Sequence, residues 1–361
     1  MISYSKGEVT QILTTYNGCT EIKVRTNSGE HRAINYHLLT GDVKPGDKVL
    51  LNTTAVQLGL GSGGYHFVVS KSGGSTISPD QVNKATGHIM KLRYTPLQFS
   101  VLSIEEENSP YHKLFHEFKN LNNMPVLIGE LHSMLLPAVF NIKRKTPTLK
   151  VAYIMTDGGA LPANFSRNVN LLKTKGLIEG TITFGQAFGG DYEAVNVYTA
   201  LIGAKAILKS DIAVITMGPG ITGTGTKYGF SGIEQGYIID AVNTLGGRPI
   251  FMPRISFADP RLRHQGLSHH SITVLKEIVQ TKAEVVLPQM TTKKCAHVRA
   301  QLETHGIHEQ HKIVLVSESE EVLKNIRHFG VKLTTMGRTL DQDREFFLTA
   351  GSAGYYAANL S

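Results

Sequence analysis

Between residue 89 and the C-terminus of the 361-residue chain, seven short apolar runs alternate with segments of helical periodicity. The runs span residues 125–128, 149–155, 180–184, 211–217, 248–253, 283–287 and 312–316. Continuous apolar runs are typical of strands that are buried on both faces, as in a parallel sheet. The spacing of apolar residues between the runs predicts helices over 163–175, 191–209, 234–245, 271–280 and 320–329. The alternation predicts an α/β domain, with a mostly parallel sheet and helices on both of its faces.

The first 72 residues have a different pattern, in which short β-type segments are separated by turn signals. Strands are predicted over residues 8–14, 21–26, 31–35, 48–53 and 65–69. Turn signals lie at Asn17-Gly18, at residues 27–29 and at residues 44–47. We therefore predict a small all-β, barrel-like domain over residues 1–72. A glycine- and serine-rich linker over 73–88 and an α/β ligand-binding domain over 89–361 are predicted to follow.

The composition argues against several classes of protein. Only Cys19 and Cys295 occur, without paired spacing, so neither a disulfide framework nor a cysteine zinc site is encoded. No segment reaches the roughly twenty apolar residues of a membrane span, and the first nine residues do not resemble a signal peptide. We expect a cytoplasmic protein with no membrane association.

The formal net charge of +8 permits attraction to nucleic acid, to an acidic membrane surface or to phosphorylated metabolites. The basic residues are spread along the chain, and no basic run is interleaved with aromatic residues for base stacking. A solvated basic surface is the favoured explanation of this charge. Charge alone therefore selects no partner.

The glycine-rich segment 218–232 follows a predicted strand and gives the clearest signal for ligand binding. It contains six glycines within fifteen residues. Glycine has no Cβ atom and permits positive φ, so successive N–H groups can converge on an anion. The residues expected to bind the anion are Gly218, Gly220, Gly223, Thr224, Gly225, Thr226 and Lys227. The alternative is a loop whose glycines serve only close backbone packing.

Two known glycine motifs fit this segment poorly. Gly218, Gly220 and Gly223 match the dinucleotide pattern G-x-G-x-x-G. However, Pro219 stiffens the first turn, and the next strand does not end in the acidic residue that binds a ribose hydroxyl. Lys227 lacks the spacing of a phosphate-binding loop lysine.

Other polar clusters also follow predicted strands, where open α/β sheets form their ligand crevice. Residues 185–193 include Gly189, Gly190 and Asp191 as candidate ligand-binding residues. Residues 254–270 include Arg261 and Arg263, which can neutralise an anion.

Three residues are candidates for catalysis: His269, His270 and Asp157. Ser268 is the expected N-cap of a helix whose first turn holds both histidines. A helix N-terminus disfavours protonated imidazole, so we expect neutral rings that can transfer a proton or bind a metal. Adjacent histidines do not share a helix face, so at most one is expected to point into the site.

The carboxylates in these clusters can bind Mg²⁺, and such an ion would bridge the protein to a bound phosphate. Mg²⁺ is therefore a candidate cofactor. The candidate ligands are Asp157, Asp191, Glu193 and Asp259, although caps and turns explain them as well. Glu130 and His132 follow the strand at 125–128 and can also reach the crevice.

Several blocks of the sequence resemble a bacterial family, domain of unknown function 3866. They are Leu131-His132-Ser133 and residues 155–162, 185–191, 218–226, 229–232 and 268–271. The resemblance covers the full length, including residues 51–55 and 94–98. It implies a bacterial protein built as one architectural unit, and it brings no activity or catalytic residues.

The favoured hypothesis is a protein that binds a phosphorylated or other anionic small molecule at its strand-end loops, with or without catalysis. A nucleic-acid-binding or ribosome-associated protein that uses the barrel and the basic surface is the first alternative. A non-catalytic scaffold is the second. Each hypothesis is compatible with a homo-oligomer.

Overall fold

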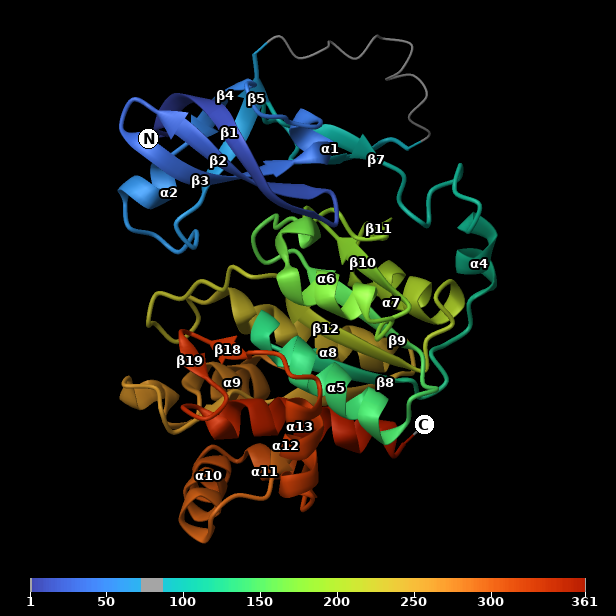
Figure 1. Cartoon of the computed structure of the whole chain (residues 1–361). Helices are drawn as coiled ribbons and strands as arrows, with labels where there is room; N and C mark the ends of the chain where they lie inside the picture. The colour runs from blue at the N-terminus through green and yellow to red at the C-terminus, as the bar shows by residue number, and fades with distance from the viewer. Residues whose placement is uncertain (1, 73–86, 361) are drawn as a thin grey trace. The chain divides into compact units, whose positions relative to one another are not determined.

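The computed structural model describes residues 2–72 and 87–360, which form two compact units (Figure 1). One unit comprises Met1–Val101 with Asn164–Asn170, and the other comprises Leu102–Ala163 with Leu171–Ser361. Residues 73–86 of the predicted linker lie outside the described residues. The boundaries predicted at residues 72 and 89 stay a prediction.

The first unit contains a closed five-stranded barrel of order β1-β2-β3-β5-β4. Its strands are β1 (Tyr4–Tyr16), β2 (Cys19–Thr26), β3 (Gly29–Tyr36), β4 (Lys48–Asn52) and β5 (His66–Lys71). The long β1 pairs with both β2 and β4, and β3 runs parallel to β5. This strand order is that of an OB-fold barrel. The barrel interior is filled by Val9, Ile22, Val24, Ala33, Val49, Leu51 and Val68.

Four short elements complete this unit: α1 (His37–Thr40), α2 (Thr54–Gln57), β6 (Ile89–Lys91) and β7 (Phe99–Val101). The predicted all-β, barrel-like N-terminal fold is confirmed. Closure removes the free strand edges that an open sheet of this size would expose.

The second unit is built on an eight-stranded sheet of order β11-β10-β9-β12-β8-β13-β16-β17. Its strands are β8 (Pro125–Gly129), β9 (Val151–Thr156), β10 (Gly180–Phe184), β11 (Tyr192–Ala194), β12 (Ile212–Met217), β13 (Arg248–Met252), β16 (Glu284–Pro288) and β17 (Lys312–Val316). Neighbouring strands pair in parallel throughout this sheet. The predicted α/β class is confirmed. Burial of the central strands on both faces explains their continuous apolar runs.

Helices cover both faces of the sheet (Figure 1). The remaining helices are α4 (His112–Glu117), α5 (Leu135–Lys145), α6 (Arg167–Thr174), α7 (Val197–Ala206), α8 (Gln235–Thr244), α9 (His269–Thr273), α10 (Thr292–Thr304), α11 (Ile307–Gln310), α12 (Ser319–His328) and α13 (Arg344–Ala358). Helices α7 and α8 contact each other on one face, whereas α5, α12 and α13 pack together on the other. Two short hairpins, β14–β15 (Ile255–Ser256 with Gly266–Leu267) and β18–β19 (Thr334–Thr335 with Arg338–Thr339), lie outside the sheet.

Several helices differ from the sequence-based predictions. The helix predicted from Asp191 begins only at Val197, because residues 192–194 form the edge strand β11 and Asn196 caps the helix with its side chain. Helices α5 and α10 were not predicted. Helix α13 was not predicted either. It is buried along almost its whole length and rich in small residues, so it lacks the polar face that gives a helical period.

The order of the strands determines where loops converge. Strands β9 to β11 lie on one side of β8, and β13, β16 and β17 lie on the other. Strand β12 is inserted between β9 and β8, so the connection from β12 to β13 crosses β8. The loops after β8, β12 and β13 therefore meet at the carboxyl edge. In open α/β sheets such a switch point forms the ligand crevice.

In the described part of the chain, no helix combines the length and the apolar character that crossing a membrane requires. Cys19 and Cys295 are both free thiols. Burial raises the pKa of the Cys19 thiol to about 11, which keeps it protonated at neutral pH.

The close approach of α13 and α5 gives a test of the packing. A Cβ atom at Gly354 would clash with the backbone carbonyl oxygen of Ala138. We expect Gly354→Ala to destabilise the protein by roughly 1–3 kcal/mol or more, measured by urea unfolding. Gly159→Ala is the matched control, because its nearest contact would be an ordinary 3.6 Å from Leu161. Equal stability of the two variants would contradict this packing.

Candidate functional site

Three histidines meet where the loops of the switch point converge. His264 ends a short 3-10 turn (Leu262–His264), and His269 and His270 begin α9. The Ser268 side chain caps α9 by accepting a hydrogen bond from the backbone N–H of His270. The ring centroids lie 4.3–5.0 Å apart. One ring nitrogen of each histidine lies within 4.8 Å of those of the other two.

Neighbouring side chains hold two of these rings in place. Nδ1 of His270 is hydrogen-bonded to Oε1 of Glu130, and its ring stacks on Phe230 at a centroid distance of 3.9 Å. Nδ1 of His264 lies 2.7 Å from the hydroxyl of Ser268. Nε2 of His269 is buried and has no hydrogen-bond partner among the described residues. Both His264 and His270 thus use Nδ1 for support, which directs Nε2 elsewhere.

Glu130 directly follows β8 and is fully buried. Its Oε1 atom also lies 3.6 Å from Nη1 of Arg254, whereas Oε2 has no partner among the described residues. A Cβ atom at position 232 would lie 2.6 Å from Cγ of Glu130. Gly232 therefore allows the glycine-rich segment to approach this carboxylate closely.

A second buried carboxylate, Asp259, organises three arginines. It accepts hydrogen bonds from Arg261 at 2.8 and 2.9 Å, and Arg254 and Arg338 approach to 3.3 and 3.5 Å. Hydrogen bonding to Arg261 holds the pKa of Asp259 well below its usual range. Arg338 is also bound by the buried Asp343 at 2.8 Å. Asp259 thus serves to position guanidinium groups, and the role of magnesium ligand considered for it does not fit.

A cavity of about 180 Å³ opens beside the histidines. It is lined by Ile221, Thr222, Gly223, Gly225, Arg254, Arg261, Arg263, His264, His270 and Met336. A Cβ atom at Gly225 would lie 3.6 Å from Nη2 of Arg263, so this arginine reaches the glycine-rich segment. Arg263 makes no hydrogen bond or ion pair with any described residue, and its guanidinium is free to bind a ligand.

Burial also determines the charge of the histidines. Desolvation, with the charges of Arg254 and Arg261, lowers the pKa of His264 to about 3. Desolvation, with the neighbouring His270 and Arg263, lowers the pKa of His269 to about 4. Both rings are neutral at physiological pH. The main cause is burial, and not the helix N-terminus on which the sequence-based expectation rested.

The chain matches a family model over residues 32–354, described as Protein of unknown function (DUF3866). The chain belongs to this family. The match confirms the resemblance seen in the sequence blocks. Neither a curated protein nor a solved structure matches the chain. DUF3866 membership assigns no activity, so function has to be argued from the geometry of the site.

The structure of this DUF3866 chain brings together only part of the predicted anion-binding set. Gly223 and Gly225 line the cavity with Arg261, Arg263 and His270. Gly218 and Gly220 instead pack against Leu161, where a Cβ atom would lie 3.2 and 2.9 Å from its Cδ1 atom. Close packing, which was the alternative interpretation of the loop, thus accounts for these two glycines.

The threonines and the lysine of the loop have partners within the protein. The hydroxyls of Thr224 and Thr226 lie 2.9 Å apart, and both bond the backbone of Gly229. Lys227 forms an ion pair with Glu277 at 2.8 Å and is not among the residues that line the cavity. The structure gives these three side chains local roles.

Gly189, Gly190 and Asp191 lie at the β10–β11 edge, away from the switch point. Asp191 accepts two hydrogen bonds from Thr181 at 2.9 Å and forms an ion pair with Lys173. The amides of Gly189 and Gly190 are bonded to side chains of neighbouring residues. Strand β10 is separated from β8 by two strands, so this group does not join the histidine cavity.

The carboxylates expected to bind magnesium do not come together. Asp157 lies against Gly185 beyond β9, whereas Asp191 is tied to β10. Within residues 2–72 and 87–360, the one cluster of three or more metal-ligand side chains consists of His264, His269 and His270. Imidazoles favour transition metals over magnesium.

The residues predicted to form the site did not include Arg254 or His264, and Glu130 was considered only as a residue that can reach the crevice. Glu130 comes directly after β8, and Arg254 comes two residues after the end of β13. This position at the end of a buried strand is the signal that points to them. His264 lies five residues before His269, in a loop without regular periodicity. Only the folded loop shows that His264 and His269 belong to one cluster.

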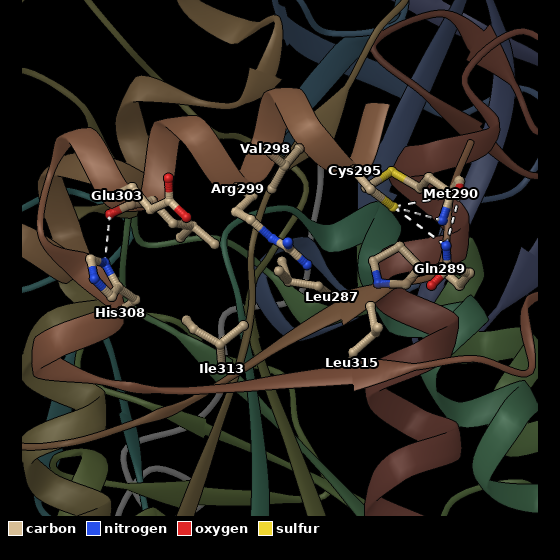
Figure 2. A pocket seen from close by; sticks show the side chains of 12 residues that line it. Leu287, Gln289, Met290, Cys295, Val298, Arg299, Glu303, His308, Ile313 and Leu315 are labelled. Carbon is tan, nitrogen blue, oxygen red and sulfur yellow. Dashed lines mark hydrogen bonds between the residues drawn. The ribbon is translucent and has the colours of Figure 1, made fainter. Parts of the chain in front are cut away.

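A larger cavity, of about 330 Å³, lies between α10 and strands β16 and β17 (Figure 2). In Figure 2, Val298 and Arg299 come from the helix, whereas Leu287, Ile313 and Leu315 come from the strands. This lining is mainly apolar and includes none of the clustered histidines. The smaller cavity has convergent charged groups, so we take it as the candidate site.

Glu234, a partly buried acid just after the glycine-rich segment, offers a test. Burial, reinforced by the charge of Asp157, raises the pKa of Glu234 from 4.5 to about 7, although it accepts a hydrogen bond from Thr156. The folded state then binds more protons than the unfolded state between pH 4.5 and 7, so this residue's contribution to stability falls as pH rises through that window.

We therefore expect Glu234→Gln to gain stability relative to the native chain as the pH increases from 4.5 to 7. The measurement is the free energy of urea unfolding of both proteins at several pH values. The difference between the two proteins removes the contribution of all other titrating groups. A difference that does not change with pH would show that the Glu234 pKa is not raised.

Proposed function

We propose that this chain binds a phosphorylated or other anionic small molecule in the cavity beside the histidine cluster. The observation that carries the proposal is the convergence of Arg254, Arg261 and Arg263 on one cavity with Gly223 and Gly225. Guanidinium groups match the planar geometry of phosphate and carboxylate oxygens. Glycines opposite them leave room for the ligand.

The charge balance of the site supports an anion. Four arginines, Arg254, Arg261, Arg263 and Arg338, are accompanied by three buried carboxylates, Glu130, Asp259 and Asp343. Since the neighbouring His264 and His269 are neutral, one positive charge is left over. The surplus lies at Arg263, whose side chain has no partner among the described residues.

The site is also preorganised. Asp259 is completely buried and holds Arg254 and Arg261 in position before any ligand arrives. Binding then needs little reordering of these long side chains, which is one of the main costs of binding. The cavity of about 180 Å³ is below the usual size of a whole ligand pocket. It therefore suits an anionic head group, with the rest of the molecule outside.

A catalytic role would require a proton-transfer group next to the bound anion. His270 lines the cavity, and its Nδ1–H donates to Glu130 when that carboxylate is ionised. The pair has the arrangement in which a carboxylate orients an imidazole for acid–base chemistry. The catalytic roles of His269, His270 and Asp157 stay predictions, and binding is the function that we propose.

Arg263→Ala tests anion binding. We expect it to weaken binding of inorganic phosphate or a phosphorylated metabolite by roughly 10- to 100-fold, the effect of losing a charge-assisted hydrogen bond. Calorimetric titration gives the affinity, and stability should not change because the side chain is exposed. Lys227→Ala is the matched control, since it removes the same charge outside the cavity. Equal loss in both variants would indicate only general electrostatic attraction.

A second candidate function is nucleic-acid binding by the barrel. The five strands have the order of an OB-fold, which often binds oligonucleotides. A groove beside β1 and β4 is lined by Lys6, Arg25 and Lys48, together with Glu8. Lys48 is paired with Glu8 at 2.5 Å and Arg25 lies 3.8 Å from Glu30, so much of this charge is compensated. We rank this function second for that reason.

Fluorescence anisotropy with a labelled single-stranded oligonucleotide separates the two functions. If the barrel binds nucleic acid, the affinity of the full chain should fall log-linearly with salt concentration. Arg25→Ala should then weaken binding, whereas Arg263→Ala should not. No binding at low salt would exclude this candidate.

A further inference from the structure

We propose that His264, His269 and His270 form a transition-metal site, for which Zn²⁺ is the best-suited ion. The three histidines offer one ring nitrogen each, and these atoms lie within 4.8 Å of one another. In a tetrahedral zinc site with bonds of about 2.0–2.1 Å, nitrogens lie roughly 3.4 Å apart. Binding therefore requires the side chains to rotate so that these nitrogens come closer together. The inference stands apart from the proposed function, because metal binding requires no anion.

The hydrogen bonds around His264 and His270 engage one nitrogen of each ring and leave the other available. Nδ1 of His270 is bonded to Glu130, and Nδ1 of His264 is bonded to Ser268. Metal-binding histidines commonly make such a bond through one nitrogen while the other binds the ion. In the part of the chain that the structure describes, Nε2 of neither ring has a hydrogen-bond partner.

His269 provides an independent observation. Its Nε2 atom is buried and has no partner among the described residues. A buried polar atom without a partner costs about 1–3 kcal/mol, and native proteins rarely leave one without a reason. Coordination of a metal would satisfy this nitrogen. Oε2 of Glu130 is a second buried atom without a described partner in the same cluster.

The surroundings suit an ion with three protein ligands. A Cβ atom at Gly223 would lie 3.7 Å from Nε2 of His270, so the absence of a side chain there leaves space beside this nitrogen. His264 and His270 both line the cavity. Zinc bound by three histidines keeps a fourth position for water or a ligand. This position would face the arginine-lined cavity.

The nearby arginines oppose a cation, but they are largely compensated. Arg254 lies between two buried carboxylates, at 3.6 Å from Glu130 and 3.3 Å from Asp259. Glu130 also contacts His270 directly, so its negative charge lies next to the proposed ligands. Arg263, which has no carboxylate partner among the described residues, would attract an anion to the open metal position.

Zinc binding by the purified full-length chain tests the proposal. After removal of metal with a chelator, we expect about one equivalent of Zn²⁺ to bind, measured by competition with a chromophoric chelator. His264→Ala and His269→Gln should each weaken binding at least 100-fold. His305→Ala, which removes a histidine outside the cluster, should bind zinc as the native chain does. Glu130→Gln should weaken binding by about 10- to 100-fold with unchanged stoichiometry.

X-ray absorption at the zinc edge of the native chain gives a result that does not depend on whether variants fold. We expect scattering from three imidazole rings and one further nitrogen or oxygen atom. No stoichiometric zinc, or zinc retained by both His264→Ala and His269→Gln, would overturn the proposal. Arg263→Ala should keep its zinc while losing anion affinity. A native chain that binds anions but no zinc would overturn only the metal proposal. A native chain that binds zinc but no anion would overturn only the anion proposal.

Discussion

The interaction on which the candidate site depends is the contact of the buried Glu130 carboxylate with His270 and Arg254. Glu130 follows β8, the strand crossed by the β12–β13 connection, so its position is set by the rigid centre of the sheet. Glu130 thus links His270, in α9, to Arg254, which follows β13. A buried carboxylate without these partners would be strongly destabilising, which ties the arrangement of the loops to the stability of the fold.

Around this contact, charged groups are arranged for chemistry more than for stability. Asp259 and Asp343 are buried and bind guanidinium groups that an apolar core would not need. Buried ion pairs of this kind are weak stabilisers, but they hold long side chains in one geometry. The result is a small cavity with fixed arginines on one side, neutral imidazoles beside them and glycine backbone opposite. Anion binding and metal binding would both use this geometry, through different atoms.

Local sequence patterns predicted the strands well and the site only in part. The apolar run at 211–217 became β12 at Ile212–Met217, because a strand buried on both faces must be apolar along its length. The glycine-rich segment was identified, but Gly218 and Gly220 proved to pack on Leu161. Glycine composition shows that something approaches the backbone closely. It does not show whether that neighbour is a ligand or a side chain.

The sequence by itself determined the α/β class, the N-terminal barrel and the carboxyl edge where polar loops follow apolar strands. These properties follow from periodicity and turn chemistry, which act over a few residues. Only the tertiary structure decided that Glu130, Arg254 and three histidines share one site, while Asp191 and Lys227 do not. The strand order β9-β12-β8-β13 differs from the chain order, and it brings together loops more than a hundred residues apart. Local patterns carry no information on that order, because it results from how whole helices and strands pack against one another.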